Sequence, residues 1–331
     1  MHISREYTFD YFLSNIYNNS YIIITSNISD IRSSKLITKL AGCKYINVMY
    51  QLFMNDKNTL TDKFKIDVSF ENTFTTKEFL SLEVGLNSFV KQLNEQSKKI
   101  IIDISCIHLR FLGAFIAVIN NYDWESIICT YTEPTAYPRA TETIPTDREK
   151  KELIGGFDLN SSFWGYEEIP NLKTISSDQN NFVWIVFLGF EGKRADSVYT
   201  EISDDINNII PVITFPSIQP GWTNFAYDAN QILFEKARIY SPDIKYTDAT
   251  NPFEAYNFIE KVKKNHPDQH IVISPLGTRP VSLGAFLYAM HNEESEIYYD
   301  TPKDSISKIL NSGKIHVYDI LSFFEKCGGR K

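Results

Sequence analysis

Two loops in the second half of the chain combine glycine with arginine, a combination suited to binding phosphate. The first, GFEGKR, spans residues 189–194 and follows an apolar segment at 182–188. The second, PLGTRP, spans residues 275–280 and follows the segment HIVIS. Glycine lets backbone N–H groups come close to a ligand, and arginine presents a planar fork of donors to phosphate oxygens. The candidate ligand-binding residues of these loops, including two hydroxyl donors, are Gly189, Glu191, Gly192, Arg194, Gly277, Thr278, Arg279 and Ser282.

The first loop allows a second interpretation. Neither loop matches the phosphate-binding patterns GxxxxGK[ST] or GxGxxG. Glu191 and Arg194 are three residues apart, so they can instead pair with each other at the solvated end of a helix. The sequence leaves both interpretations open.

Trp222 is a further candidate for ligand binding. It lies in PGWTN, between a predicted strand and a predicted helix. A tryptophan in that position could stack on a base. We favour the alternative that the ring packs in an apolar seam between domains, because large aromatic side chains are usually well buried.

Two carboxylates in the first half raise the possibility of an enzyme. Asp103 ends the predicted strand KIIID, Glu133 ends ICTYTE, and Arg110 lies between them in the chain. Carboxylates at one sheet edge could act as general acid and base on a nucleoside or phosphoribosyl substrate. The alternative, which we favour, is that Asp103 accepts hydrogen bonds at a helix start and Glu133 pairs with an arginine. Arg110 is also a candidate ligand-binding residue of the first half.

Other reaction classes find no support in the sequence. Of the 6 histidines, His266 and His270 are four residues apart, but Pro267 interrupts any common helix. The metalloprotease pattern HExxH and the nucleophile pattern GxSxG are absent. We therefore expect no metal site and no cofactor.

A repeated junction gives the chain its organisation. Both halves carry Ile-x-Ile-Ser, at 102–105 and 271–274, and then LGAF, at 112–115 and 283–286. Both then carry Tyr-x-x-Pro, at 131–134 and 299–302. The repeat favours an internal duplication, although two α/β domains could also reach similar helix-packing solutions independently.

The elements around these residues alternate between apolar β-branched segments and amphipathic ones, which indicates parallel strands flanked by helices. We predict an α/β fold of two Rossmann-like domains with mainly parallel sheets, related by internal duplication. The predicted domains are 1–140 and 182–331, joined by a connection at 141–181. Within the first domain we expect an edge strand at 62–70 and a helix over 75–96 capped by threonine.

Composition limits the partners and the compartment. Net charge is −8, which argues against a duplex nucleic acid as partner. The 4 cysteines form no CxxC pair, and no apolar run is long enough to cross a bilayer. We expect a cytoplasmic protein with no membrane partner, and a homo-oligomer is possible.

The second-half loops carry a resemblance to a known group of domains. Gly277, Thr278 and Arg279 resemble the Gly-Thr-Lys signature of the CRISPR-associated Rossmann-fold (CARF) sensor domains, and residues 189–194 match the loop after their first strand. Arg279 stands where lysine is commoner, Pro275 and Leu276 replace the usual lead-in, and 106–110 has no Gly-Thr pair. Two such units in one chain are similar to the SAVED sensors of bacterial anti-phage signalling. The chain also looks like a bacterial family with the motifs YTEPxxYP, GFEGxRA and PLGTKP.

The resemblance implies a protein that senses a nucleotide or cyclic-oligonucleotide second messenger in bacterial anti-phage defence. A separate effector chain would be its partner, and a CARF-like second domain would hold the better-preserved site. Two alternatives remain: a nucleotide-processing enzyme that uses Asp103 and Glu133, or a ligand-free adaptor subunit of a defence complex.

Overall fold

A computed structural model describes residues 6–18, 20–40, 42–56, 59–70, 73–137, 163–166, 169–172, 181–292, 295–302 and 309–326. The chain forms two units. Unit 1 contains Met1–Thr135 and Ile309–Lys331, and unit 2 contains Ala136–Lys308. The C-terminal segment thus groups with the first unit, whereas the sequence assigned all of 182–331 to one domain. Most of the connection at 141–181 lies outside the described residues.

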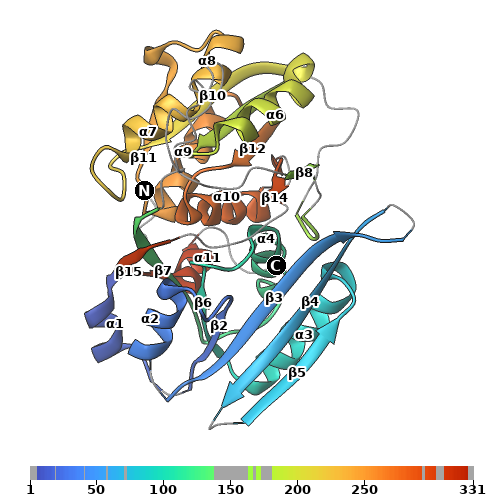
Figure 1. Cartoon of the computed structure of the whole chain (residues 1–331), viewed down its shortest axis with the longest axis vertical. Coiled ribbons are helices and arrows are strands. Elements are labelled where there is room, and N and C mark those ends of the chain that lie inside the picture. Colours follow the sequence, from blue (N-terminus) through green and yellow to red (C-terminus); the bar gives the residue numbers. More distant parts are fainter. Residues whose placement is uncertain are drawn as a thin grey trace, which may run out of the picture. The chain divides into compact units, whose positions relative to one another are not determined.

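Unit 1 is built on an eight-stranded sheet (Figure 1). Its strands, in spatial order, are β1 (Glu6–Thr8), β15 (Asn311–Asp319), β7 (Ser126–Ala136), β6 (Lys99–Asp103), β2 (Ile22–Thr25), β3 (Lys44–Met54), β4 (Leu60–Phe70) and β5 (Thr73–Phe79). The central strands β3, β2, β6 and β7 are parallel to their neighbours in this series. The pairs β3–β4, β4–β5 and β1–β15 are antiparallel, so the sheet is mixed.

Helices cover both faces of this sheet. They are α1 (Phe9–Asn15), α2 (Ile31–Lys39), α3 (Leu82–Gln96), α4 (Leu109–Ile119) and α11 (Ile320–Lys326). The crossovers β2–α2–β3 and β6–α4–β7 run in opposite directions along the sheet. Right-handed crossovers therefore put α2 and α4 on opposite faces.

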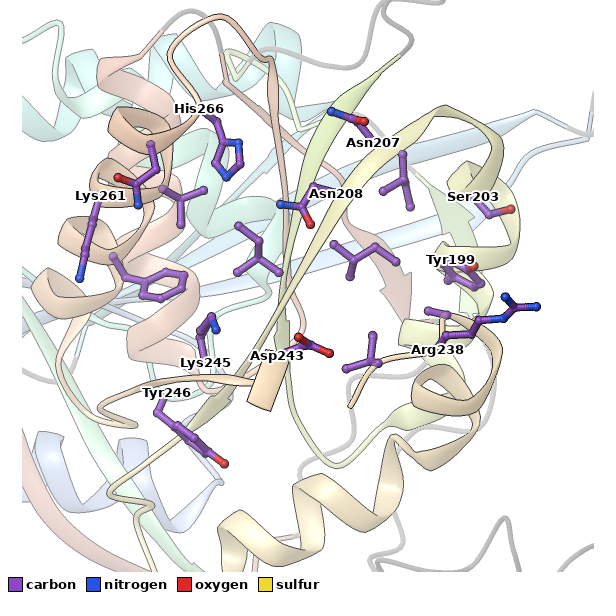
Figure 2. A pocket seen from close by; sticks show the side chains of 18 residues that line it. Tyr199, Ser203, Asn207, Asn208, Arg238, Asp243, Lys245, Tyr246, Lys261 and His266 are labelled. Carbon is purple, nitrogen blue, oxygen red and sulfur yellow. The ribbon is translucent and has the colours of Figure 1, made fainter. Parts of the chain in front are cut away.

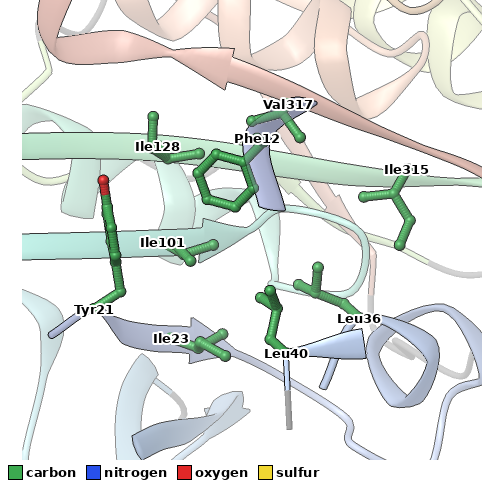
Figure 3. Close-up of a cluster of buried hydrophobic side chains, with 9 residues drawn as sticks. All are labelled: Phe12, Tyr21, Ile23, Leu36, Leu40, Ile101, Ile128, Ile315 and Val317. Atoms are coloured by element: carbon green, nitrogen blue, oxygen red, sulfur yellow. The ribbon is translucent and has the colours of Figure 1, made fainter. Parts of the chain in front are cut away.

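Apolar side chains of unit 1 pack on the face that α1 and α2 cover, as Figure 3 shows. Phe12 of α1 and Leu36 of α2 are fully buried against isoleucines of three central strands, Ile23, Ile101 and Ile128. Ile315 and Val317 of β15 belong to the same cluster. Burial of these β15 side chains explains why the C-terminal segment groups with unit 1.

The antiparallel end of the sheet differs from the sequence-based expectation. The segment at 62–70 is not an edge strand, because β5 pairs with it along its length. The predicted helix over 75–96 begins only at Leu82, after Ser81 accepts the first-turn hydrogen bond from the Val84 N–H. The alternating residues before it form β5 instead, and Phe79 stacks on Phe64 at a ring separation of 4.5 Å.

Unit 2 is built on a five-stranded sheet whose strands are all parallel. Their spatial order is β11 (Lys245–Thr247), β10 (Ile206–Thr214), β9 (Phe182–Leu188), β12 (Ile271–Pro275) and β13 (Ser295–Ile297). Its helices are α6 (Gly192–Ile202), α7 (Trp222–Ala229), α8 (Gln231–Lys236), α9 (Pro252–Asn265) and α10 (Arg279–His291). A separate antiparallel pair joins β8 (Phe163–Tyr166) to β14 (Asp300–Pro302).

The two sheets share the order of four parallel strands. In unit 1 the parallel strands lie in the order β3-β2-β6-β7, and in unit 2 four of the five parallel strands lie in the corresponding order β10-β9-β12-β13. Each set of four is second-first-third-fourth in its own chain order, as in doubly wound α/β folds, whereas β11 adds a parallel strand beside β10 where unit 1 has the antiparallel β4 beside β3. The predicted α/β class with parallel, helix-flanked strands is therefore confirmed, whereas the internal duplication stays a prediction. Unit 1 departs from a mainly parallel sheet because the antiparallel strands β4 and β5 extend one side of the series and β15 and β1 the other.

No helix in the described part of the chain has the length and apolar character that crossing a bilayer requires.

Candidate functional site

The two glycine-arginine loops of unit 2 lie against each other at the carboxyl ends of β9 and β12. These strands are parallel neighbours, so the loops that follow them emerge at the same edge. A Cβ atom at Gly189 would lie 2.6 Å from the carbonyl oxygen of Leu276, so only glycine allows this approach. Asn230 fixes the first loop from the other side by donating from Nδ2 to the Gly189 oxygen at 2.8 Å.

This edge is the topological switch point of the sheet. From β9 the chain crosses to β10, and from β12 it crosses the opposite way to β13. Right-handed crossovers then send α6 and α10 to opposite faces of the sheet. In open α/β sheets, ligands bind outside the carboxyl ends of the strands at such a point.

The helices that begin at this edge lack a capping side chain. The N-cap residues of α6, α7 and α10 are Glu191, Gly221 and Thr278, and none of them accepts a side-chain hydrogen bond from its helix. First-turn N–H groups that no side chain caps, together with the positive end of the helix dipole, attract anions. In α6 the Arg194 N–H donates to the Glu191 carbonyl at 3.0 Å, and in α10 Pro280 contributes no N–H, so each first turn lacks one donor.

Arg194 is not available as a phosphate fork in this arrangement. Its side chain is 5% exposed, and Nη1 lies 2.9 Å from the Glu191 carboxylate. Its guanidinium also lies over the ring of Tyr299, 5.0 Å from the ring centre. The interpretation of Glu191 and Arg194 as an ion pair is confirmed, but the pair is buried rather than solvated.

Arg279 is the arginine of the loops that stays half-exposed. It begins α10 directly after Gly277 and Thr278. Burial raises the pKa of the neighbouring Tyr299, and the charges of Arg194 and Arg279 oppose that rise. The opposing effect indicates that both guanidinium groups lie near the Tyr299 hydroxyl.

The hydroxyls of the second loop hold the loop itself. Thr278 Oγ1 donates to the Ala249 carbonyl at 2.6 Å. Ser282 is fully buried, and its Oγ lies 3.1 Å from the Pro275 oxygen and 3.2 Å from the Thr278 oxygen. These side chains therefore position Arg279 and the first turn of α10.

Gly192 and Trp222 also have packing roles. A Cβ at Gly192 would lie 1.7 Å from the Ala229 oxygen, so this glycine lets α6 contact the end of α7. Trp222 is 8% exposed and packs edge-on against Phe190 and tilted against Tyr137, with ring separations of 5.4 Å in both cases. The favoured interpretation of Trp222 as a packed residue is thus confirmed.

The equivalent edge of unit 1 is occupied by the chain's own carboxylates. Asp30, the N-cap of α2, accepts from the Arg32 backbone N–H at 2.8 Å and from Arg32 Nε at 3.0 Å. Asp103 is 0% exposed and accepts from Thr25 Oγ1, Ser33 Oγ and the Ser105 N–H at 2.7–3.0 Å. Asp103 is thus a structural acceptor, as the favoured interpretation predicts, and presents no surface to a substrate.

Arg110 is engaged at a different place from Asp103. Its guanidinium forms a buried ion pair with Asp62 of β4 and donates to the Tyr50 hydroxyl of β3 at 2.5 Å. Burial lowers the pKa of Arg110, but Tyr50 and Asp62 together outweigh that effect and raise it. Arg110 therefore joins α4 to the antiparallel part of the sheet.

Glu133 pairs with a histidine rather than an arginine. His316 of β15 lies with Nε2 2.8 Å from Glu133 and Nδ1 2.9 Å from Glu6 of β1. Burial disfavours the charged imidazole, yet the hydrogen bonds to both glutamates outweigh it and raise the His316 pKa to about 9. Burial also raises the Glu133 pKa, but His316 and the Lys314 N–H reverse that effect and lower it. These three side chains link β1, β7 and β15. The shifts in the pKa values of His316 and Glu133 stabilise their ion pair and do not provide a general acid beside a general base.

Several residues at these edges were not predicted. These residues are Asn230, Tyr299, Asp30, Asp62 and His316, and their partners lie up to 310 residues away in the chain. Only Asp30 carries a local signal, because an aspartate directly before an amphipathic segment is a typical N-cap.

The described residues contain no group of three or more His, Cys, Asp and Glu side chains that could hold a metal ion. Neither the models of known protein families nor the sequences of curated proteins match the chain.

Loss of the Arg110 ion pair should destabilise unit 1. In Arg110→Ala, Asp62 stays buried without its cation, so we expect the free energy of unfolding to fall by about 3–5 kcal/mol. Urea denaturation measures the change, with the exposed Arg238→Gln as a control that should shift by less than about 0.5 kcal/mol. An Arg110→Ala protein as stable as the wild type would show that this guanidinium is not a structural group.

The glutamates around His316 should make stability depend on pH. Because the folded His316 pKa is about 9 against 6.5 for an unperturbed histidine, its contribution is full below pH 6.5 and disappears as the pH rises to about 9. The unfolding free energy of the wild type minus that of His316→Gln should therefore fall by roughly 1–3 kcal/mol over this range. Denaturation curves at intervals of pH measure the difference.

The Glu133→Gln background provides the control for this pH effect. There the same difference should be smaller, because one of the two carboxylates that raise the pKa is gone. A difference that is constant from pH 6.5 to 9 in the wild-type background would contradict the assignment.

Proposed function

We propose that the chain is a nucleotide-binding sensor whose ligand occupies the carboxyl edge of β9 and β12 in unit 2. The observation that carries the proposal is the meeting of the two glycine loops at the switch point of the sheet. There α6 and α10 begin without capping side chains, and Arg279 remains half-exposed beside them. Backbone N–H groups and one guanidinium fit a phosphate group.

Within this proposal the residues have different roles. Arg279 and the N–H groups of Gly192 in α6 and Val281 in α10 contact the phosphate, whereas the Arg194 N–H donates to the Glu191 carbonyl. Glu191 and Arg194 keep each other buried and support the first loop, and Thr278 and Ser282 hold the second loop. The ring of Phe190, which is partly exposed, is better placed than the buried Trp222 to meet a base.

The common strand order supports an internal duplication, in which unit 1 is the copy that has lost its ligand. Asp30 and Asp103 there accept the hydrogen bonds that an anion would accept. The asymmetry supports a single ligand-binding edge per chain, in unit 2.

Three further parts of the proposal rest on the resemblance of residues 277–279 to the CARF signature. The ligand is a cyclic-oligonucleotide messenger, the setting is cytoplasmic anti-phage defence, and a separate effector chain responds to the bound ligand. The enzyme alternative loses its candidate residues, because Asp103 is buried and Glu133 is paired. We therefore expect binding without turnover.

A thermal-shift screen of mono-, di- and cyclic oligonucleotides tests the proposal. At a ligand concentration a hundred times its Kd, stabilisation is about 2.7 kcal/mol, so the melting temperature should rise by roughly 4 °C or more. Arg279→Ala should bind at least about tenfold more weakly, because it removes a charged phosphate contact, and should keep the wild-type melting temperature without ligand.

Arg238→Gln is the matched control for Arg279→Ala, since Arg238 is exposed and lies at the amino end of the sheet. It should bind the same ligand as tightly as the wild type. Mass spectrometry of the recovered ligand distinguishes a sensor from an enzyme. Unchanged affinity in Arg279→Ala would refute the site, and a panel without any shift would refute the function.

A further inference from the structure

A groove at the opposite, amino end of the unit 2 sheet has no part in the proposed nucleotide site. It has a volume of about 870 Å³ and is lined by residues of β10, α9, the end of α6 and the segment 237–246 (Figure 2). Five consecutive residues of β10, Ile206–Ile210, line it. Because alternate side chains of a strand point to opposite faces, a groove lined by consecutive residues runs along the edge of the strand.

The edge of β10 is uncovered along this groove. β11 pairs only with Val212–Thr214, whereas β9 pairs with β10 from Ile206 to Ile213. Among the strands that the structure describes, residues 206–211 therefore have a neighbour on the β9 side only. An uncovered edge offers backbone donors and acceptors to an added strand, and proteins use such edges to bind extended peptides.

The walls of the groove suit an extended chain. Phe258 and Val262 of α9 line one side, and Tyr199 of α6 lines the other, so apolar surface flanks the strand edge on both faces of the sheet. Figure 2 shows α9 and α6 on either side of β10. Five residues of added strand would span roughly 17 Å, the length of the five β10 residues that line the groove.

The charges at the groove favour an acidic partner. Arg238, Lys245 and Lys261 line it, and all three are exposed. Asp243 is the one acidic residue among the described lining residues, and its carboxylate accepts the Tyr240 N–H at 2.9 Å. This cationic group contrasts with the net charge of −8 of the whole chain.

We propose that this groove binds an extended, acidic segment of another protein, which adds to the sheet as a strand beside Ile206–Ile210. Its carboxylates meet Arg238 and Lys261, and its apolar side chains contact Phe258 and Val262. A second copy of this chain is disfavoured as the occupant, because pairing two β10 edges would bring two sets of the same cations together. The proposal is independent of the nucleotide site, since no residue is shared between them.

Fluorescence anisotropy with labelled ten-residue peptides tests the proposal. The probe alternates glutamate and valine, and its counterpart alternates lysine and valine. A third peptide keeps the glutamates but carries N-methylated valines, which cannot donate backbone hydrogen bonds. We expect the first peptide to bind at least about tenfold more tightly than either of the others, because both charge and strand pairing contribute.

Charge-changing variants identify the groove as the site. Arg238→Gln combined with Lys261→Gln should weaken binding of the acidic peptide roughly tenfold, and Arg238→Glu combined with Lys261→Glu should reverse the preference to the lysine peptide. Both residues are exposed, so the variants should keep the wild-type melting temperature. Arg279→Ala should leave peptide binding unchanged, which separates this site from the nucleotide site.

Hydrogen–deuterium exchange locates the bound peptide. Added protection should appear in residues 206–211 and leave residues 189–194 and 277–282 unchanged. Equal binding of the glutamate and lysine peptides, equal binding of the N-methylated peptide, or protection elsewhere would overturn the proposal. Displacement of the peptide by pyrophosphate, with no protection of β10 by the peptide, would show a simple anion site and would overturn it as well.

Discussion

The N-terminal amides of helices at the carboxyl edge of a parallel sheet need acceptors, and the two units differ in how they supply them. In unit 1, Asp30 accepts from the first turn of α2 and His108 from that of α4. In unit 2, α6 and α10 begin without such an acceptor. The same order of four parallel strands therefore carries side-chain-capped helices in unit 1 and helices without a capping side chain in unit 2, and the proposed anion site rests on this difference.

The arginines differ in the same way between positions that are buried beside a carboxylate and positions that solvent reaches. Arg32, Arg110 and Arg194 are buried beside Asp30, Asp62 and Glu191, so each is neutralised within the chain. Buried pairs of this kind fix geometry, and losing one partner leaves an expensive charge behind. Arg279 remains half-exposed at a helix start, and Arg238 and Lys261 are exposed at the other end of the same sheet. The half-exposed Arg279 at one end of the strands and the exposed Arg238 and Lys261 at the other are consistent with the two separate sites that we propose, one for a small anion and one for an acidic chain.

Local sequence patterns predicted much of the fold and part of the site. Apolar runs such as 182–188 and 271–275 form buried parallel strands, and Asn251 caps α9 as a typical N-cap before proline. Sequence patterns placed the loops after β9 and β12 at strand ends, and parallel pairing brought them together. Sequence patterns did not predict the features that depend on packing between distant residues. Phe79 continues a strand because it stacks on Phe64. The strand β15 belongs to unit 1 because Ile315 and Val317 are buried there. The burial of Arg110 and Arg194 was equally inaccessible, since a loop arginine looks the same in sequence whether or not a carboxylate folds against it.

Amide hydrogen exchange at the first turns of the helices tests the central claim most directly, by comparing the free protein with the protein bound to whichever nucleotide stabilises it. In the free protein, the amides of Arg32 and Arg110 already donate to the side chains of Asp30 and His108, so they should exchange slowly and not respond to the ligand. The first-turn amides of Gly192 in α6 and Val281 in α10 should exchange faster and become protected when the ligand binds. Protection that appears in α2 and α4 instead, or no change at α6 and α10 under saturating ligand, would contradict the account.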